Sequence, residues 1–472
     1  MESIDTPLYK YVDILNLTHE TIGKKIFILG RVHKVRKAGS LCFLILRYQH
    51  KSIQCVCHKN NMPIEKFKEV LSLNSESLIE VYGTIVSVPD DVGKVDATYY
   101  HTMEIKLDKI KMISASIQLP FSILDADATT NEEDFRNNIL LDTRLNNRWI
   151  DLRVPYMTCI FKLQSMITQL FREFLLKEKF IEIHSPKLLG TASESGASVF
   201  SVKYFNKQAY LAQSPQLYKQ MAISSDFDRV FEIGPVFRAE NAYSRRHLCE
   251  FTGLDLEMAI KPNDNGIYDY HTITDLIWKL LKFIHVQIYA HCHEEIEYVR
   301  QRTNFTDLHI PENPLYINYI DGVNMLKEEG IDMEYTEDLN TLAEKTLGQI
   351  IKERYGSDMF ILDGYPSNIR PFYTMPKESD NNFSNSYDII LAGIEISSGA
   401  QRIHDYEFLC RRIAEKGISK ESLFGYLDSF KYGSGPHGGC GLGLERILML
   451  LFGLNDVKVC SLFPRDPSRI VP

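Results

Sequence analysis

Long apolar runs are missing from this 472-residue chain, and no stretch approaches the roughly 18 consecutive apolar residues that a membrane-spanning helix needs. The N-terminus also lacks the basic and then apolar pattern of a secretory signal. The nine cysteines show none of the paired spacings that are typical of zinc sites. We therefore expect reduced thiols, a cytoplasmic protein and no membrane partner.

Basic residues are fewer than acidic ones: the chain has 53 lysines and arginines and 62 aspartates and glutamates, which gives a net charge of −9. That balance argues against a protein that coats nucleic acid through its overall charge. A local exception lies at residues 24–51, which hold eight basic residues and no acidic ones. Taken alone, such a run is more often a solvated strand surface than an RNA-binding face.

The segment 22–115 has the pattern of a small β-domain that follows an N-terminal segment, residues 1–21. Its runs of β-branched and aromatic residues, separated by turn residues, are Lys25–Arg36, Leu41–Arg47, Ser52–Cys57, Leu78–Val88 and Thr98–Met112. Five strands in about 90 residues suit a closed barrel such as the OB-fold. The acidic run Asp125–Asp134 lies within residues 116–150, which we interpret as a hinge or linker.

The remaining segment, residues 151–472, alternates helical and strand-like patterns. Ile160–Glu178 has helical periodicity, and the short strand-like run Phe180–Ile183 leads from it into Pro186. Read without any family, this is a helix, a strand and a turn.

The most informative stretch is Val230–Ile260, VFEIGPVFRAENAYSRRHLCEFTGLDLEMAI. A first strand-like run ends at Arg238, a basic loop follows, and a second run carries Phe251, Asp255 and Glu257. Two antiparallel strands joined in this way would aim a guanidinium, an aromatic ring and two carboxylates into one cleft. That set suits a nucleoside triphosphate and its metal ions.

A second stretch, Gly438–Leu451 (GGCGLGLERILMLL), brings glycine-rich backbone and Arg446 to the start of a helix. Such a junction allows close approach of a phosphate beside a fixed guanidinium. Residues 433–438 also match GxGxxG, but the chain ends 34 residues later. That distance leaves no room for a complete dinucleotide-binding unit.

These segments resemble the three motifs of the class II aminoacyl-tRNA synthetases: Phe161–Leu188 resembles motif 1, Val230–Ile260 motif 2 and Gly438–Leu451 motif 3. The ending GLDLEM of motif 2 looks most like the aspartyl enzymes of subclass IIb. The resemblance implies an N-terminal OB-fold that binds the anticodon and an α+β catalytic domain built on an antiparallel sheet. It also implies ATP, Mg²⁺, L-aspartate and tRNA-Asp as ligands and a homodimer through motif 1, and it leaves membership of a larger synthetase complex open.

For ATP, the resemblance implies that Arg238 grips the α-phosphate, Phe251 stacks on adenine and Arg446 lies near the γ-phosphate. Glu240 completes the catalytic set with the two arginines. The residues implied for ATP binding are Arg238, Glu240, Arg246, His247, Leu248, Phe251, Glu395, Gly443 and Arg446. Those implied for the metal are Asp388, Glu395 and Ser398, with Glu257 as a further candidate. Positioning and charge, without a general base, would carry the chemistry.

For aspartate, Lys219 and Arg402 match basic residues that pair with the side-chain carboxylate of the substrate, and Asp255 would hold its ammonium group. A neutral amide would leave both cations buried without a counter-charge, so we expect aspartate to be preferred over asparagine. The residues implied for aspartate binding are Ser193, Glu194, Gln213, Gln216, Lys219, Asp255, Ser398 and Arg402. Ser193 and Glu194 would belong to a lid.

In the barrel, Phe43, Gln54 and Glu104 match positions that stack on or hydrogen-bond to anticodon bases. The plainer alternative places Phe43 in the core, because it shares a strand face with Ile45 and Arg47. Gln54 and Glu104 would then be ordinary solvent-facing strand residues.

The chain departs from the family pattern at Arg245, where a histidine is usual near ATP or the tRNA end. Cys440 and Ser195 each replace a glycine, and we expect Cys440 to tighten the approach to the nucleotide and Ser195 to stiffen the lid. The alternatives are an asparaginyl enzyme, a catalytically silent RNA-binding paralogue and a tRNA-independent asparagine synthetase. The Lys219–Arg402 pair argues against the first, intact Arg238 and Arg446 against the second, and the barrel against the third.

Overall fold

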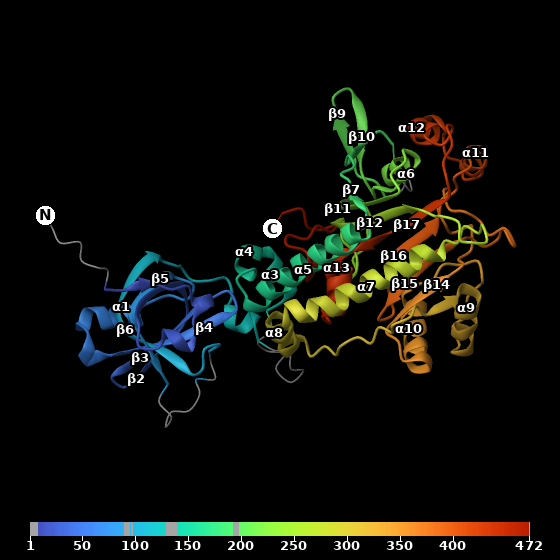
Figure 1. Cartoon of the computed structure of the whole chain (residues 1–472). Helices are drawn as coiled ribbons and strands as arrows, with labels where there is room; N and C mark the ends of the chain where they lie inside the picture. Colours follow the sequence, from blue (N-terminus) through green and yellow to red (C-terminus); the bar gives the residue numbers. More distant parts are fainter. Residues whose placement is uncertain (1–7, 89–94, 96–97, 129–138, 192–197, 472) are drawn as a thin grey trace. The chain divides into compact units, whose positions relative to one another are not determined.

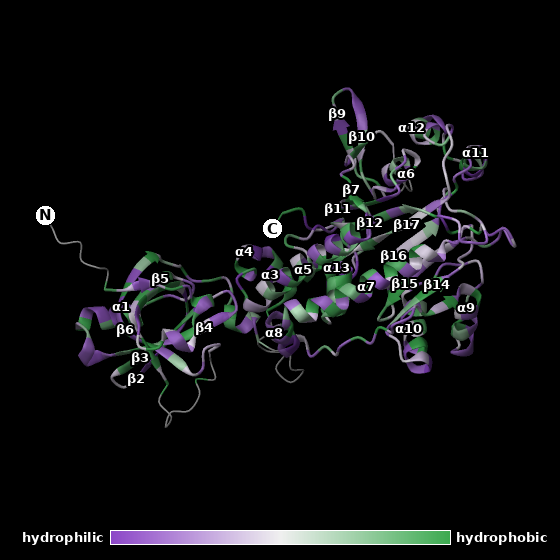
Figure 2. Ribbon diagram, in the orientation of Figure 1, coloured by the Kyte–Doolittle hydropathy of each residue, from purple (hydrophilic) through white to green (hydrophobic). Residues whose placement is uncertain are grey.

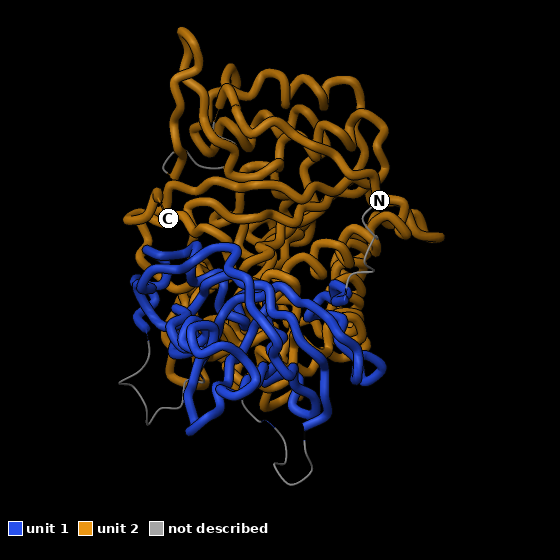
Figure 3. The backbone as a smooth tube through the Cα atoms, turned by 90° about the vertical axis from the view of Figure 1, so that its left-hand side faces the viewer, with its two compact units in different colours: residues 1–159, 472 blue, residues 160–471 orange. Residues whose placement is uncertain are grey.

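The computed structural model describes residues 8–88, 95, 98–128, 139–191 and 198–471. The chain divides into two compact units, residues 1–159 with Pro472 and residues 160–471 (Figure 3). This division falls inside helix α5 (Pro155–Lys177), whereas the sequence predicted a domain border at residues 150 and 151. Within the described residues, no helix is both long and apolar enough to cross a membrane.

The first unit is built around a closed barrel, as the sequence predicted (Figure 1). Its strands are β2 (Lys25–Ala38), β3 (Leu41–Tyr48), β4 (Lys51–His58), β5 (Leu78–Ser87) and β6 (Met103–Ser114). They pair in the order β2-β3-β4-β6-β5, and β5 pairs back with β2 to close the barrel. The short β1 (Lys10–Tyr11) adds to β2, and the helices of this unit are α1 (Ile64–Leu71), α2 (Ile123–Ala126), α3 (Leu141–Asn146) and α4 (Arg148–Asp151).

Strand alternation decides which side chains fill the barrel. Leu44 of β3, Cys55 of β4 and Ile105 of β6 are fully buried in its core. Because successive strand residues point to opposite faces, Phe43 is directed away from that core and remains half-buried. The core alternative for Phe43 is therefore not what the structure shows.

The second unit contains an eight-stranded sheet in the order β13-β14-β15-β16-β17-β12-β11-β7. Its strands are β13 (Tyr316–Asn318), β14 (Met359–Asp363), β15 (Ser386–Leu391), β16 (Ile394–Gln401), β17 (His437–Gly443), β12 (Glu250–Ala259), β11 (Arg229–Phe237) and β7 (Ile181–Glu182). The six strands from β14 to β11 are antiparallel, and only the end strands β13 and β7 join in parallel. The predicted antiparallel catalytic sheet is confirmed.

A separate three-stranded sheet is formed by β8 (Leu188–Leu189), β10 (Lys207–Leu211) and β9 (Ser201–Tyr204). The hydrophilic β9 and the hydrophobic β14, whose residues are all buried, differ clearly in Figure 2. The further helices of the second unit are α6 (Gln216–Ser224), α7 (His271–His291), α8 (His293–Thr303), α9 (Tyr319–Glu328), α10 (Thr341–Tyr355), α11 (Tyr406–Glu415), α12 (Phe424–Asp428) and α13 (Leu444–Leu451).

Helices α5 and α7 cover one face of the large sheet (Figure 1). The ring of Phe171 on α5 lies 6.0 Å from that of Phe231 on β11, and Phe174 lies 5.5 Å from Phe283 on α7. On β12 the buried residue Leu256 alternates with Asp255 and Glu257. One face of the sheet is therefore an apolar support, and the other face carries the carboxylates.

Candidate active site

A pocket of about 390 Å³ opens over the face of the sheet that carries the carboxylates. Predicted residues that line it are Gln213, Gln216, Arg238, Glu240, Arg246, His247, Leu248, Phe251, Asp255, Glu395, Ser398, Arg402, Gly443 and Arg446. Lys219 and Asp388 lie just behind this lining, each in an ion pair with a lining residue. Ser193, Glu194 and Ser195 fall outside the described residues.

The pairing of β11 with β12 brings the predicted guanidinium and aromatic ring together. Val236 pairs with Phe251, so Arg238, just beyond the end of β11, lies beside the start of β12. The Arg238 guanidinium carbon is 5.6 Å from the centroid of the Phe251 ring, within cation–π range. The nearby carboxylate of Glu240 is 3.9 Å from Arg238 and also 3.9 Å from His247.

The segment Gly438–Leu451 joins the same sheet, because its strand pairs antiparallel with β12. Strand β17 lies between β12 and β16 and ends at Gly443, the residue that precedes helix α13. From the first turn of α13, Arg446 Nη1 donates to the carbonyl of Glu395 at 2.7 Å, and Nη2 donates to that of Arg246 at 3.4 Å. Arg446 is thereby held at a fixed place beside the loop between β11 and β12.

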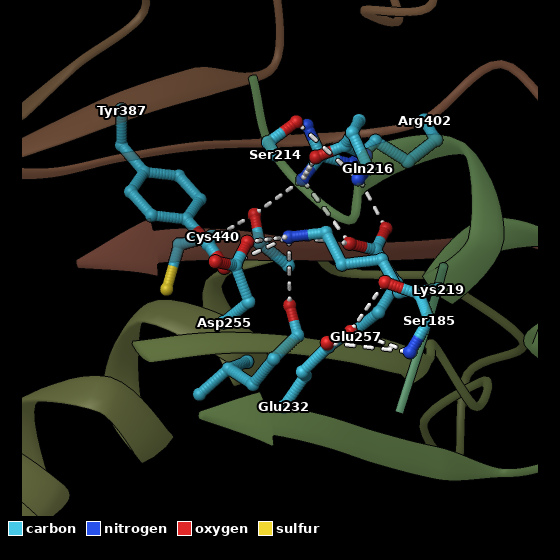
Figure 4. A network of polar contacts seen from close by, with 12 residues as sticks. Ser185, Ser214, Gln216, Lys219, Glu232, Asp255, Glu257, Tyr387, Arg402 and Cys440 are labelled. Carbon is cyan, nitrogen blue, oxygen red and sulfur yellow. Dashed lines mark hydrogen bonds and ion pairs between the residues drawn. The ribbon is translucent and has the colours of Figure 1, made fainter. Parts of the chain in front are cut away.

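Four buried charges form a network at the other end of the pocket (Figure 4). Lys219 Nζ on α6 is 2.9 Å from Asp255 Oδ1 and 3.5 Å from Glu257 Oε2. Arg402 donates from Nε to Glu257 Oε1 at 2.9 Å and from Nη2 to Gln216 Oε1 at 3.3 Å. Burial opposes ionisation of Glu257, yet Arg402 and Lys219 together hold its pKa below the ordinary value.

This network corrects two expectations. The two cations were expected to lack a counter-charge without a substrate carboxylate, but Asp255 and Glu257 already neutralise Lys219 and Arg402. Glu257 was a further candidate for a metal ligand, but it is fully buried and bound to both cations. A sequence pattern identifies charged residues but does not show which of them are partners.

The predicted metal residues lie on two neighbouring strands. Asp388 on β15 pairs directly with Ser398 on β16, and Arg370 contacts both, with its Nη2 2.9 Å from Asp388 Oδ1 and its Nη1 2.8 Å from Ser398 Oγ. Burial and the adjacent Asp388 carboxylate raise the pKa of Glu395 to about 7. Two carboxylates that repel one another in this way favour a nearby cation.

No cluster of three or more histidine, cysteine or acidic residues suited to a metal occurs in the part of the chain that the structure describes. The oxygen set of Asp388, Glu395 and Ser398 nevertheless fits Mg²⁺. This ion is commonly held by one or two carboxylates together with phosphate oxygens of a substrate.

Sequence reasoning missed Glu344, Arg370 and Tyr373, which also line the pocket. Glu344 lies in the first turn of α10 and accepts a hydrogen bond from Arg246 Nη1 at 2.8 Å. The Arg402 guanidinium lies 5.4 Å from the centroid of the Tyr373 ring. None of the three belongs to a motif, so only their position in space identifies them.

Known proteins resemble this chain along nearly all of its length. The family model of class II tRNA synthetases (D, K and N) matches residues 141–467, and that of the OB-fold nucleic acid binding domain matches residues 26–113. Cytoplasmic aspartate–tRNA ligase 1 of Arabidopsis thaliana is 43% identical over 98% of this chain and 86% of its own length. The cytoplasmic aspartate–tRNA ligase of Homo sapiens is 41% identical over 100% of this chain and 93% of its own.

The chain belongs to the aspartate–tRNA ligase family. The aspartyl-tRNA synthetase structure from Entamoeba histolytica has a TM-score of 0.89 and 39% identity, and the alignment covers 99% of this chain and 94% of that one. The asparaginyl-tRNA synthetase structure from Pyrococcus horikoshii with asparaginyl-adenylate has a TM-score of 0.86 but 29% identity, over 98% and 100% of the two chains. The fold is thus shared with asparaginyl enzymes, and the aspartyl structure has the higher identity.

Two departures from the family pattern can now be placed. Arg245 is exposed and is not part of the pocket lining.

Cys440 is fully buried on β17. Its two neighbours, Gly439 and Gly441, have side-chain positions that face Glu257 and Asp255. Alternation along the strand turns the Cys440 thiol to the opposite face of the sheet, the face on which a Cβ at Gly438 would meet Ile273 of α7. The expectation that Cys440 tightens the approach to the nucleotide is therefore wrong.

We predict that Cys440→Ala leaves the KM for ATP and the KM for aspartate within about twofold, because the thiol lies on the supporting face of the sheet. Gly441→Ala is the matched comparison, because its new Cβ would lie 3.0 Å from Asp255 Oδ1. We expect Gly441→Ala to raise the KM for aspartate. Steady-state kinetics of both variants checks this, and a tenfold effect of Cys440→Ala on ATP would contradict the placement.

Proposed function

We propose that this chain is a cytoplasmic aspartate–tRNA ligase that activates L-aspartate with ATP and transfers it to the 3′ end of tRNA-Asp, releasing AMP and pyrophosphate. The relatives that cover nearly all of it carry that name, and the chain spans most of their length. The observation that supports aspartate most directly is the buried network of Lys219, Asp255, Glu257 and Arg402 in the pocket.

The other end of the pocket suits the nucleotide. An adenine ring stacked on Phe251 would lie beside Arg238. The triphosphate would then extend toward Arg246 and Arg446. In the reaction, the substrate carboxylate attacks the α-phosphorus, and negative charge grows on the phosphate oxygens and the departing pyrophosphate. Fixed guanidinium groups stabilise that charge without reorganising, which lowers the barrier.

Aspartate selection follows from an exchange of partners inside the network. The ammonium group of the substrate would pair with Asp255, and this releases Lys219 to pair with the side-chain carboxylate of the substrate. Asparagine offers the same ammonium group but only a neutral amide, so buried Lys219 would keep Glu257 as its single carboxylate partner. The loss of one of two partners at a buried cation disfavours asparagine. Gln213 and Gln216 line the same end of the pocket and supply neutral polar contacts.

We predict ATP–pyrophosphate exchange with aspartate and none with asparagine, glutamate or lysine. Arg402→Ala should lower kcat/KM for aspartate at least ~100-fold, because it leaves Glu257 buried with a single partner. The KM for ATP should stay nearly unchanged, since Arg402 lies at the amino acid end. Arg411→Ala, an exposed arginine on α11, is the control. Exchange with asparagine, or normal aspartate turnover in Arg402→Ala, would overturn the substrate assignment.

We propose that Asp388, Glu395 and Ser398 hold Mg²⁺ together with the phosphates. When bound, the ion neutralises charge on the triphosphate. Glu395 must be ionised for this, and its pKa is about 7 in the free protein. Arg370 pairs with Asp388 here and would share that carboxylate with the ion.

The affinity for ATP in the presence of Mg²⁺ should therefore rise on the order of tenfold from pH 6 to pH 8, as Glu395 loses its proton. In Glu395→Gln the affinity should be weaker and the pH dependence should be lost. In Glu445→Gln the dependence should persist. Glu445 is a matched control because burial also raises its pKa to about 7. Its carboxylate oxygens are already used as acceptors for the Thr252 amide, at 3.0 and 3.1 Å, and it is not a proposed metal ligand. Calorimetric titration with ATP gives both profiles, and a flat wild-type profile would argue against Glu395 as a ligand.

We further propose that the outer face of the barrel binds the anticodon. Gln54 Nε2 donates to Glu104 Oε2 at 2.9 Å, and the two residues pair across β4 and β6. Arg36 lies 4.3 Å from the centroid of the half-buried Phe43 ring, so a cation and an aromatic ring share this face. A cation beside an aromatic ring suits a stacked base with its phosphate.

Phe43→Ala should raise the KM for tRNA about tenfold through the loss of one stacking contact, without changing ATP–pyrophosphate exchange. Tyr48→Ala removes an exposed ring at the end of the same strand and serves as the control. Aminoacylation kinetics with tRNA-Asp measures both. An equal effect of the two substitutions would show that Phe43 has no specific part in recognition.

We also propose a homodimer through residues 161–188. β7 is an end strand of the large sheet, and Leu176, Ile181 and Leu188 expose about half of their surface. An exposed apolar edge of this kind favours burial against a second copy. The proposed lid residues Ser193 and Glu194 come five and six residues after the end of this segment in the sequence.

A further inference from the structure

Helix α10 brings a buried carboxylate, Glu344, into the nucleotide end of the pocket. Asn340 caps the helix by accepting from the amides of Leu342 and Ala343. One turn after Glu344, Gly348 packs against Gly393, so closely that a Cβ at position 348 would lie 2.4 Å from the Gly393 Cα. Only a glycine permits this approach, and it sets the position of α10 along the β15–β16 turn.

The same contact determines where Glu344 lies. Residues four apart share one face of a helix, so Glu344 and Gly348 both point to the β15–β16 hairpin. Glu395 lies two residues after Gly393 at the start of β16. Glu344 therefore lies beside Glu395 with its side chain buried, and Arg246 Nη1 donates to its Oε2 at 2.8 Å.

The partner of Glu344 belongs to a segment without regular secondary structure. Arg246 lies between β11 and β12, outside both strands. An arginine side chain there carries about 2 kcal/mol of rotamer entropy that a ligand would have to remove on binding. The ion pair with Glu344 removes this rotamer entropy before a ligand binds. The bond from Arg446 to the Arg246 carbonyl fixes the backbone as well.

The electrostatics of Glu344 agree with a paired state. Burial raises its pKa, and Arg246 opposes that shift. A guanidinium has five N–H donors in one plane, so a bond to Glu344 leaves the same group with capacity for phosphate oxygens. A carboxylate on one edge of Arg246 thus orients the other edge toward the pocket.

We propose that Glu344 is a positioning residue for the adenylation reaction, which holds Arg246 ready for the triphosphate of ATP. The proposal rests on the proposed function, because the nucleotide is its ligand. Glu344 acts through Arg246, and its loss should affect ATP rather than aspartate.

The first test compares Glu344→Gln with Glu353→Gln, the same change at an exposed position of α10. The Kd for ATP, titrated without aspartate, and the KM for ATP should rise about tenfold in Glu344→Gln. The KM for aspartate should stay within twofold, and Glu353→Gln should match the wild type. An unchanged Kd for ATP, or equal effects on both substrates, would overturn the proposal.

The second test is a double-mutant cycle with Arg246→Ala. If Glu344 acts through Arg246, Glu344→Gln should have no further effect on the Kd for ATP in the Arg246→Ala background. Multiplying effects would show that Glu344 acts independently. Glu344→Asp, which keeps the charge but shortens the reach, replaces the glutamine variant if that variant does not fold. A wild-type protein that binds ATP but shows no aspartate exchange would refute the proposed function and leave this test intact.

Discussion

The pairing of four buried charges at the centre of the large sheet is the constraint on which the rest of the catalytic unit depends. Asp255 and Glu257 come from β12, Lys219 from α6, and Arg402 follows β16. Each ion placed out of water costs several kcal/mol unless its partners are close and well oriented. Helix α6 and strands β12 and β16 must therefore keep one mutual arrangement, and that arrangement is the amino acid end of the pocket.

Glycines in β17 make this arrangement possible. A Cβ on Gly439 would lie 2.1 Å from the Leu256 carbonyl oxygen and 2.5 Å from Glu257 Oε2, so any other residue would push the network apart. The bare backbone also supplies acceptors, because the Gly439 carbonyl accepts from Arg402 and the Cys440 carbonyl from Lys219, each at 2.9 Å. The glycine-rich motif thus serves the amino acid end as well as the phosphate end.

At the nucleotide end the cations are also paired with groups of the protein, but they are less deeply buried. Arg246 pairs with Glu344, Arg446 with the Glu395 carbonyl, and Arg370 with Asp388. Each cation is held by the protein before any ligand arrives. Ligand binding at both ends is then an exchange or sharing of partners, which avoids leaving a buried charge unsatisfied at any stage.

The sequence by itself determined the barrel strands, the antiparallel pair around Arg238 and Phe251, and the glycine-to-helix junction at Arg446. These features are local: strand alternation, turn residues and motif spacing act over a few residues. Only the tertiary structure decided that Glu257 belongs to Arg402 and Lys219, that the Cys440 thiol faces away from the pocket, and that Glu344 meets Arg246. Those outcomes depend on which strands become neighbours and how closely a helix docks, and residues far apart in the sequence, such as Arg246 and Glu344 or Glu257 and Arg402, carry no local pattern that records their contact.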